Sequence, residues 1–301
     1  MARYTHEQLM CMSRPASDTE ETKMENARNA IMNALSQSEI LKSNAYEVFG
    51  QGSYANNTNI RNNSDIDINV CYTDAYYFDL PENVTRQELG LNNSVEYSYQ
   101  SYKNDIEKML IQYFGAANVV RKNKCIHING NSYRAEIDVV PTWKYRRFSD
   151  KRGTYKEGVL LYSDDYQRVI NYPKQHLNNG ICKNNDTLRR YKRLVRIIKN
   201  LKIKMEDANY YKNDSVTSFL IEGLVYNYPN AKYLLSYSSF DWNTIIRDFI
   251  YYFWNGCSAE NEAWKGWVEP SECLYLMYGH KWKHSDVKEF MYNLWNFLQY
   301  N

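Results

Sequence analysis

The 301-residue sequence lacks the two most familiar phosphate-binding motifs. It contains no G-x-x-x-x-G-K-[ST] string, which argues against P-loop chemistry. It also has no glycine-rich loop followed by H-R-D, which argues against a protein-kinase site. A large net charge is missing as well, because 37 Lys and Arg residues nearly balance 35 Asp and Glu residues and leave +2 at pH 7. Any phosphate recognition must therefore come from local clusters.

Long apolar runs are also absent. No stretch reaches the ~20 residues that a bilayer span needs, and the first residues, Met1–His6, form no apolar segment of a secretory signal. We therefore expect no membrane partner and a cytoplasmic location. The six cysteines never form C-x-x-C, a pattern typical of free thiols in a reducing compartment.

One C-terminal group resembles a zinc site at first sight. It consists of Cys257, Cys273, His280 and His284. The gap between its two cysteines is unlike the paired spacing of structural zinc sites. We favour ordinary buried or surface residues here.

Hydrophobic periodicity predicts a mixed α/β part followed by a helical part. Strands are expected over 46–49, 64–70, 118–121, 124–129, 133–140 and 157–162. Helices are expected over 18–47, 100–114, 186–204, 215–227, 241–254 and 285–299. Asn178-Asn179-Gly180 interrupts the pattern and predicts a break there. We therefore expect two domains, residues 1–180 and residues 181–301.

The first chemical signal is the triplet Asp65-Ile66-Asp67 in an alternating segment. On a strand, residues i and i+2 point to the same face, so both carboxylates project together about 7 Å apart. Carboxylate oxygens are the ligands that Mg²⁺ prefers, commonly shared with substrate phosphates. The triplet alone is weak evidence, because it also occurs in solvated strand edges, loop caps and metal-dependent glycosyltransferases.

Two further features strengthen the signal. Gly52-Ser53 follows a short strand, and glycine lets the backbone approach a ligand while the serine hydroxyl and nearby N–H groups hold phosphate oxygens. An ordinary strand-exit turn is the alternative. The second feature is Asp138, set among β-branched residues, where a charge is costly unless it meets a cation. Glu136 shares its face, so periodicity alone leaves the choice between the two open.

The chain resembles the polymerase-β-like nucleotidyltransferases in two strings, Gly50–Tyr54 and Ser64–Ile68. It is most similar to the bacterial cGAS/DncV-like nucleotidyltransferases (CD-NTases) of CBASS antiphage defence, and within them to the CdnE clade. Further likeness lies in Glu136–Pro141, Asn171–His176, Arg190–Arg196 and Ser215–Asn227. The resemblance implies an α+β core with a mixed twisted sheet and a C-terminal helical domain, the two forming a cleft.

The resemblance also implies roles for matching residues. Gly52 and Ser53 would hold the triphosphate, Asp65 and Asp67 would ligate both of two Mg²⁺ ions (or Mn²⁺ in their place), and Asp138 would ligate one. Asp138 would also help to deprotonate the attacking 3′-hydroxyl. The resemblance selects Asp138 over Glu136, because the family's aspartate stands just before V-V-P.

Other nucleotide contacts are predicted in the helical part and before it. Arg189, Lys192, Arg196 and Lys199 share one face of the basic helix, and we favour Lys192 and Lys199 as triphosphate contacts over a solvated basic face. Asn171 could read a pyrimidine edge or simply occupy a turn. Ser215 is read most simply as a helix N-cap, although its hydroxyl could line the nucleotide pocket.

These features predict a template-independent synthase that joins nucleoside triphosphates, with ATP and UTP expected, into a cyclic di- or oligonucleotide. The product would be a second messenger that activates a downstream effector. One alternative is a nucleotidyltransferase acting on an RNA or protein acceptor, although no dedicated nucleic-acid-binding region stands out. The other is an inactive nucleotide-binding regulator, which the intact carboxylates disfavour.

Overall fold

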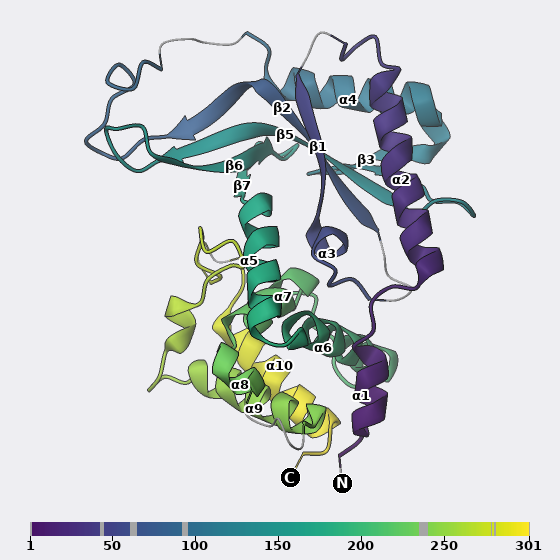
Figure 1. Ribbon diagram of the computed structural model, residues 1–301, viewed down its shortest axis with the longest axis vertical. Helices are drawn as coiled ribbons and strands as arrows, with labels where there is room; N and C mark the ends of the chain where they lie inside the picture. The colour runs from purple at the N-terminus through teal and green to yellow at the C-terminus, as the bar shows by residue number, and fades with distance from the viewer. Residues whose placement is uncertain are drawn as a thin grey trace. The chain divides into compact units, whose positions relative to one another are not determined.

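The computed structural model describes residues 2–42, 45–60, 65–91, 96–234, 240–277, 279 and 281–300. The chain forms two compact units (Figure 1). The sheet unit comprises residues 17–55 and 64–173, and the helical unit comprises residues 1–16, 56–63 and 174–301. The first sixteen residues and the segment 56–63 thus group with the helices. The predicted division at residue 180 and the predicted cleft stay predictions.

The sheet unit is built on seven described strands in the order β1-β2-β5-β4-β3, with β6 beside β5 and β7 beside β6. Their bounds are β1 Tyr46–Gln51, β2 Ile66–Asp79, β3 Val119–Arg121, β4 Ile126–Ile128, β5 Ile137–Phe148, β6 Tyr155–Tyr162 and β7 Arg168–Asn171. β2 and β5 pair in parallel, whereas the other pairs are antiparallel. The mixed sheet confirms the predicted fold class.

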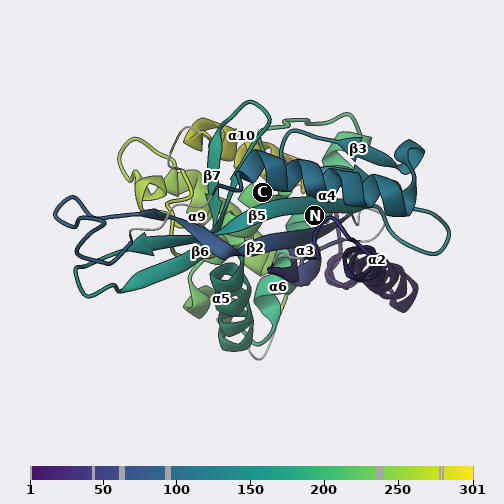
Figure 2. The same ribbon diagram turned by 90° about the horizontal axis from the view of Figure 1, so that it is seen from above.

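Two helices of the sheet unit pack beside the strands (Figures 1 and 2). α4, Tyr99–Phe114, is anchored by tyrosine hydroxyls, since Tyr102 donates to the Val70 carbonyl at 3.1 Å and Tyr99 to the Pro141 carbonyl at 3.0 Å. α2, Asp18–Ser36, begins at a capping box on Ser17. The prediction of a helix over 18–47 was therefore too long. Two shorter helices are α3, Gly52–Ala55, and the 3₁₀ turn η1, Ala116–Asn118.

The helical unit surrounds one apolar core drawn from several helices, with buried members such as Leu194, Leu224, Phe249 and Phe290. Its elements are α1 His6–Met12, α5 Pro173–Asp186, α6 Arg190–Asp207, α7 Ser218–Asn227, α8 Asn230–Leu234, α9 Trp242–Gly256, η2 Ala263–Gly266 and α10 His284–Phe297. The helices predicted over 215–227, 241–254 and 285–299 are confirmed to within a few residues. No helix among the described residues is both long and apolar enough to cross a membrane.

The break predicted at Gly180 is wrong. α5 continues through it, and Gly180 is buried facing Tyr191. The helix start predicted at residue 186 is also wrong, because α5 ends there and α6 begins at Arg190. Thr187 links the two helices: its hydroxyl donates to the Lys183 carbonyl at 2.7 Å and accepts from the Tyr191 amide at 3.1 Å. Packing has overridden the local breaker signal.

Candidate active site

The turn from β1 into α3 brings its backbone against a catalytic candidate. Gly52 has φ +66°, in the left-handed region that glycine favours. A Cβ atom added there would lie 2.1 Å from Oδ2 of Asp67. The adjacent Gln51 is the register partner of Asp67 across the β1–β2 pair. The predicted Gly52-Ser53 element and Asp67 therefore lie together in the sheet unit.

Asp67 and Asp138 are direct neighbours in the sheet. They are register partners on the parallel strands β2 and β5, which lie about 4.8 Å apart. Asp65, just before β2, is exposed. Burial first, and then the charges of Asp138 and Asp65, raise the pKa of Asp67 to about 7, against the opposing effect of Lys122. The three predicted carboxylates thus form a cluster whose members repel one another.

Two side chains that the sequence did not predict for the site, His127 and Lys122, contact Asp138. His127 Nδ1 lies 2.7 Å from Asp138 Oδ1, and Lys122 Nζ lies 3.1 Å from the same oxygen. Burial favours the neutral acid, but the hydrogen bonds from His127 and Lys122 outweigh it and lower the pKa of Asp138. His127 is the antiparallel register partner of Asp138. The sequence signal for His127 was its place as a polar residue between Ile126 and Ile128 in a predicted strand.

Glu136 has a different position from Asp138. β5 begins at Ile137, one residue after Glu136, and the side chain of Glu136 is 55% exposed. Its carboxylate lies 3.8 Å from His127 Nε2, the ring nitrogen that faces away from Asp138. Asp138 rather than Glu136 is therefore the carboxylate beside Asp67.

The carboxylates have the chemistry of a hard divalent cation site. A cation would stabilise these three carboxylates, one of which, Asp67, has a pKa raised by burial and then by its like-charged neighbours. In this structure Lys122 supplies positive charge to Asp138. Among the described residues no three Asp, Glu, His or Cys side chains are already drawn into a metal-binding arrangement.

Asn171 ends β7 of the sheet unit and pairs with Val159 of β6. Its side-chain amide is half-buried and makes no hydrogen bond within the described residues. Its backbone is closely packed, because a Cβ atom on Gly158 would lie 2.7 Å from the Asn171 carbonyl oxygen. The amide is thus available to a ligand and sits on a fixed strand end.

The remaining predicted contacts belong to the helical unit. Lys192 is half-buried on α6. Lys199 is buried, and its ammonium donates to the Thr58 carbonyl at 3.0 Å. Ser215 is exposed and does not cap α7, whose N-cap is Thr217, so the N-cap reading of Ser215 was wrong. The roles of all three in nucleotide binding stay predictions.

Lys199 belongs to a buried polar network that fixes the segment after α3. Glu222 accepts hydrogen bonds from the Thr58 hydroxyl at 2.9 Å and faces His176 Nε2 at 2.9 Å, while Lys199 Nζ lies 3.8 Å away. Burial favours the neutral acid, but His176, Lys199 and Thr58 together lower the pKa of Glu222 to about 2. The network holds Thr58, six residues beyond Gly52 along the chain.

The C-terminal cysteines and histidines have ordinary surroundings where they are described. Cys257 is buried, and Cys273 is partly buried. The ring of His284 stacks on Trp264 with centroids 4.5 Å apart. His280 lies outside the described residues.

Known proteins are similar to both parts of the chain. Residues 178–299 match the family described as the cGAS/DncV-like nucleotidyltransferase C-terminal helical domain. Over 301 residues, and 100% of both chains, the sequence is 47% identical to the cyclic dipyrimidine nucleotide synthase CdnE of Cecembia lonarensis.

Two solved structures are similar in fold over nearly the whole chain. One is the Elizabethkingia meningoseptica CdnE cyclic dinucleotide synthase with GTP and Apcpp, with a TM-score of 0.82, 35% identity and coverage of 99% of this chain and 100% of that chain. The other is the Rhodothermus marinus CdnE c-UMP-AMP synthase with Apcpp and Upnpp, with a TM-score of 0.82, 25% identity and coverage of 97% and 95%. Membership in a nucleotidyltransferase family implies a divalent metal. The chain belongs to the cGAS/DncV-like nucleotidyltransferases, within their CdnE clade of cyclic nucleotide synthases.

Proposed function

We propose that the protein joins two nucleoside triphosphates through 3′–5′ links into a cyclic dinucleotide, with UTP used together with UTP or ATP. The register pairing of Asp67 with Asp138 carries this proposal, because it sets two carboxylates side by side where the Gly52-Ser53 turn meets them. The pyrimidine preference is supported by the name of the C. lonarensis relative, a cyclic dipyrimidine nucleotide synthase, and by that of the R. marinus c-UMP-AMP synthase.

In this proposal Asp65, Asp67 and Asp138 hold two Mg²⁺ ions, or Mn²⁺ in their place. When bound, such ions would neutralise charge on the phosphates and would lower the pKa of the attacking hydroxyl. Gly52 lets the backbone approach the phosphate chain, and Ser53 donates its hydroxyl to it. Asp138 accepts the proton of the 3′-hydroxyl, and His127 keeps its carboxylate oriented.

Residues outside the carboxylate cluster bind the nucleotides. Asn171, whose side-chain amide makes no hydrogen bond with the described residues, reads the base edge. Lys192 and Ser215 contact substrate directly. Lys199 contacts the triphosphate in this proposal, and its ammonium also donates to the Thr58 carbonyl and lies 3.8 Å from Glu222. The first transfer yields a linear intermediate, and the second closes the ring, with pyrophosphate released each time.

The cyclic product serves as a second messenger for a downstream effector in antiphage defence, as the resemblance to CBASS synthases implies. The reaction is tested by incubating the full chain with α-labelled nucleoside triphosphates and Mg²⁺ and then treating the products with phosphatase. A labelled small product that resists phosphatase supports ring closure. Label retained on protein or RNA would support the alternative acceptors, and bound nucleotide without any product would support an inactive regulator.

A further inference from the structure

The helical unit contains a hollow of about 460 Å³ whose charged lining is entirely basic. It is bounded by the segment after α1, by Asn57, and by the turn from α5 into α6. Its cations are Arg14, Arg189, Lys192, Arg193 and Arg196. No aspartate or glutamate is among its lining residues. A concave site with one sign of charge concentrates ligands of the opposite sign.

Most of these cations lack an ion-pair partner in the part of the chain that the structure describes. Within the described residues Arg14, Arg189, Lys192 and Arg193 form no ion pair. Burial first, and then repulsion by Arg193, lower the pKa of Arg196 to about 10. Elsewhere in the same unit some lysines are paired with carboxylates, as Lys232 is with Asp248 at 2.8 Å. An anion in the hollow would relieve the repulsion between Arg193 and Arg196.

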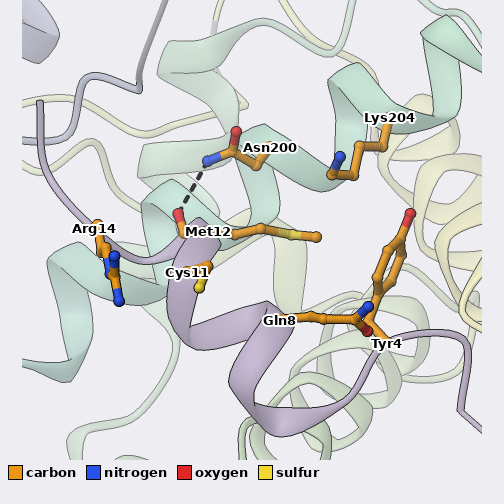
Figure 3. A pocket seen from close by; sticks show the side chains of 7 residues that line it. All are labelled: Tyr4, Gln8, Cys11, Met12, Arg14, Asn200 and Lys204. Atoms are coloured by element: carbon orange, nitrogen blue, oxygen red, sulfur yellow. Dashed lines mark hydrogen bonds between the residues drawn. The ribbon is translucent and has the colours of Figure 1, made fainter.

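The hollow is a built site with a fixed wall. Arg196 is only 6% exposed. Its Nε donates to the Ser13 carbonyl at 2.7 Å and its Nη1 to the Asn57 carbonyl, which leaves Nη2 without an acceptor in the described part of the chain. Asn200 donates to the Met12 carbonyl at 3.0 Å and fixes the end of α1 on α6 (Figure 3). Arg14 follows directly and lines both this hollow and the neighbouring one of about 400 Å³ drawn in Figure 3.

The turn between α5 and α6 is held in an uncommon conformation. Leu188 and Arg189 have φ +52° and +60°, both in the left-handed region, which is unfavourable for residues that carry a Cβ atom. The Arg189 amide donates to the Asn184 carbonyl at 2.7 Å and closes the turn. This turn places Arg189 at the edge of the hollow, next to the first turn of α6, which carries Lys192 and Arg193.

We propose that this hollow binds the phosphate chain of a small polyphosphorylated ligand, either free polyphosphate or the phosphate tail of a nucleotide. Guanidinium forks match phosphate oxygens bidentately, and the volume suits a small molecule. The net charge of only +2 argues against an extended nucleic-acid surface. The inference rests on the proposed function only for the role of Lys192, since the other four cations have no part in that proposal.

The test is equilibrium binding of inorganic triphosphate, ATP and UTP to the full chain in EDTA, where the carboxylates hold no metal. The Arg14→Gln/Arg193→Gln double variant should weaken binding at least about tenfold, because it removes two charge-assisted contacts to phosphate oxygens. Lys212→Gln removes one exposed positive charge outside the hollow, and Asp65→Asn/Asp67→Asn disables the proposed catalytic site. Both of these variants should bind as the unchanged protein does.

A nucleotide affinity above that for triphosphate, with the excess lost in the arginine double variant, would identify a nucleotide tail as the ligand, and equal affinities would identify free polyphosphate. Three results would overturn the proposal. They are no binding at millimolar triphosphate, full binding by the arginine double variant, and an affinity for oligoribonucleotides that rises with their length and exceeds the affinity for triphosphate. Loss of synthesis in the aspartate variant with binding retained separates the two proposals, since only the proposed function depends on those carboxylates.

Discussion

At the scale of single residues, the carboxylates were the most predictable part of the site. Strand periodicity places Asp65 and Asp67 on one face, and a charge among β-branched residues marked Asp138. His127 and Lys122, which contact Asp138, were not predicted, because local sequence does not determine that β4 pairs with β5 or in which register. His127 meets Asp138 only through that pairing.

Gly52 should be intolerant of a side chain for a reason specific to this site. Gly52→Ala introduces a Cβ atom that would meet Asp67 Oδ2 at 2.1 Å, so Asp67 must move and the rate of synthesis should fall by about 100-fold. Gly90→Ala is the matched control, since Gly90 has φ +65° and nothing within 4 Å of its Cβ position. Each variant should lose roughly 1 kcal/mol of stability from its backbone. Only Gly52→Ala should lose activity, and an active Gly52→Ala protein would contradict the close approach.

His127 should act through Asp138 and not on substrate. His127→Ala removes the 2.7 Å contact to Asp138, so kcat should fall by about 10-fold or more while KM for nucleotides changes little. His127→Gln keeps a donor and should recover part of the rate. Steady-state kinetics of the three proteins measure this. A rise in KM with kcat unchanged would assign His127 to substrate binding instead.

At the scale of elements, the alternation of apolar and polar residues predicted the strands well. The strands expected over 46–49, 64–70, 124–129 and 157–162 all overlap observed strands. Helix ends were less predictable. Asn178-Asn179-Gly180 is a strong breaker signal in isolation, yet contacts from other helices keep α5 continuous. Such contacts are absent from any local window of sequence.

The continuity of α5 predicts how a substitution at Gly180 changes the stability of the fold. A Cβ atom there would meet Tyr191 at 3.8 Å, an ordinary van der Waals distance, so Gly180→Ala should raise the free energy of unfolding by about 0.5–1 kcal/mol. Gly223→Ala in α7 is the contrasting variant, because its Cβ would lie 2.6 Å from Leu276 and should destabilise the fold. Urea unfolding of both variants decides the matter. A destabilised Gly180→Ala protein would indicate that the helix does break there.

At the scale of the whole molecule, buried polar groups join segments far apart in the chain. Glu222 of α7 meets Thr58, His176 of α5 and Lys199 of α6. No sequence window contains this set, and for this helix the sequence suggested only triphosphate contacts or a solvated basic face. The structure buries Arg196 and Lys199 instead, because each finds backbone carbonyl acceptors.

The Glu222 network predicts a dependence of stability on pH. Its pKa of about 2 lies below the ordinary value of 4.5, so the fold favours the ionised carboxylate. That contribution is fully present above pH 4.5 and is lost as the pH falls through about 2. Glu222→Gln should cost about 3 kcal/mol at pH 7 and progressively less below pH 4.5. Urea unfolding at pH 7 and 3.5 measures the difference.

The control for this prediction is Glu260→Gln, on an exposed carboxylate without an ion pair in the described part of the chain. It should change stability little at either pH. A Glu222→Gln penalty that stays constant between pH 7 and 3.5 would show that packing, and not the charge of Glu222, accounts for the loss.

The most direct test of the central claim is mass spectrometry of the products formed by the full chain from all four nucleoside triphosphates with Mg²⁺. We predict a cyclic dinucleotide containing uridine, formed by the unchanged protein and absent from Asp67→Asn and Asp138→Asn proteins that remain folded. Cyclic product formed at an undiminished rate by either aspartate variant would contradict the assignment of the reaction to these carboxylates.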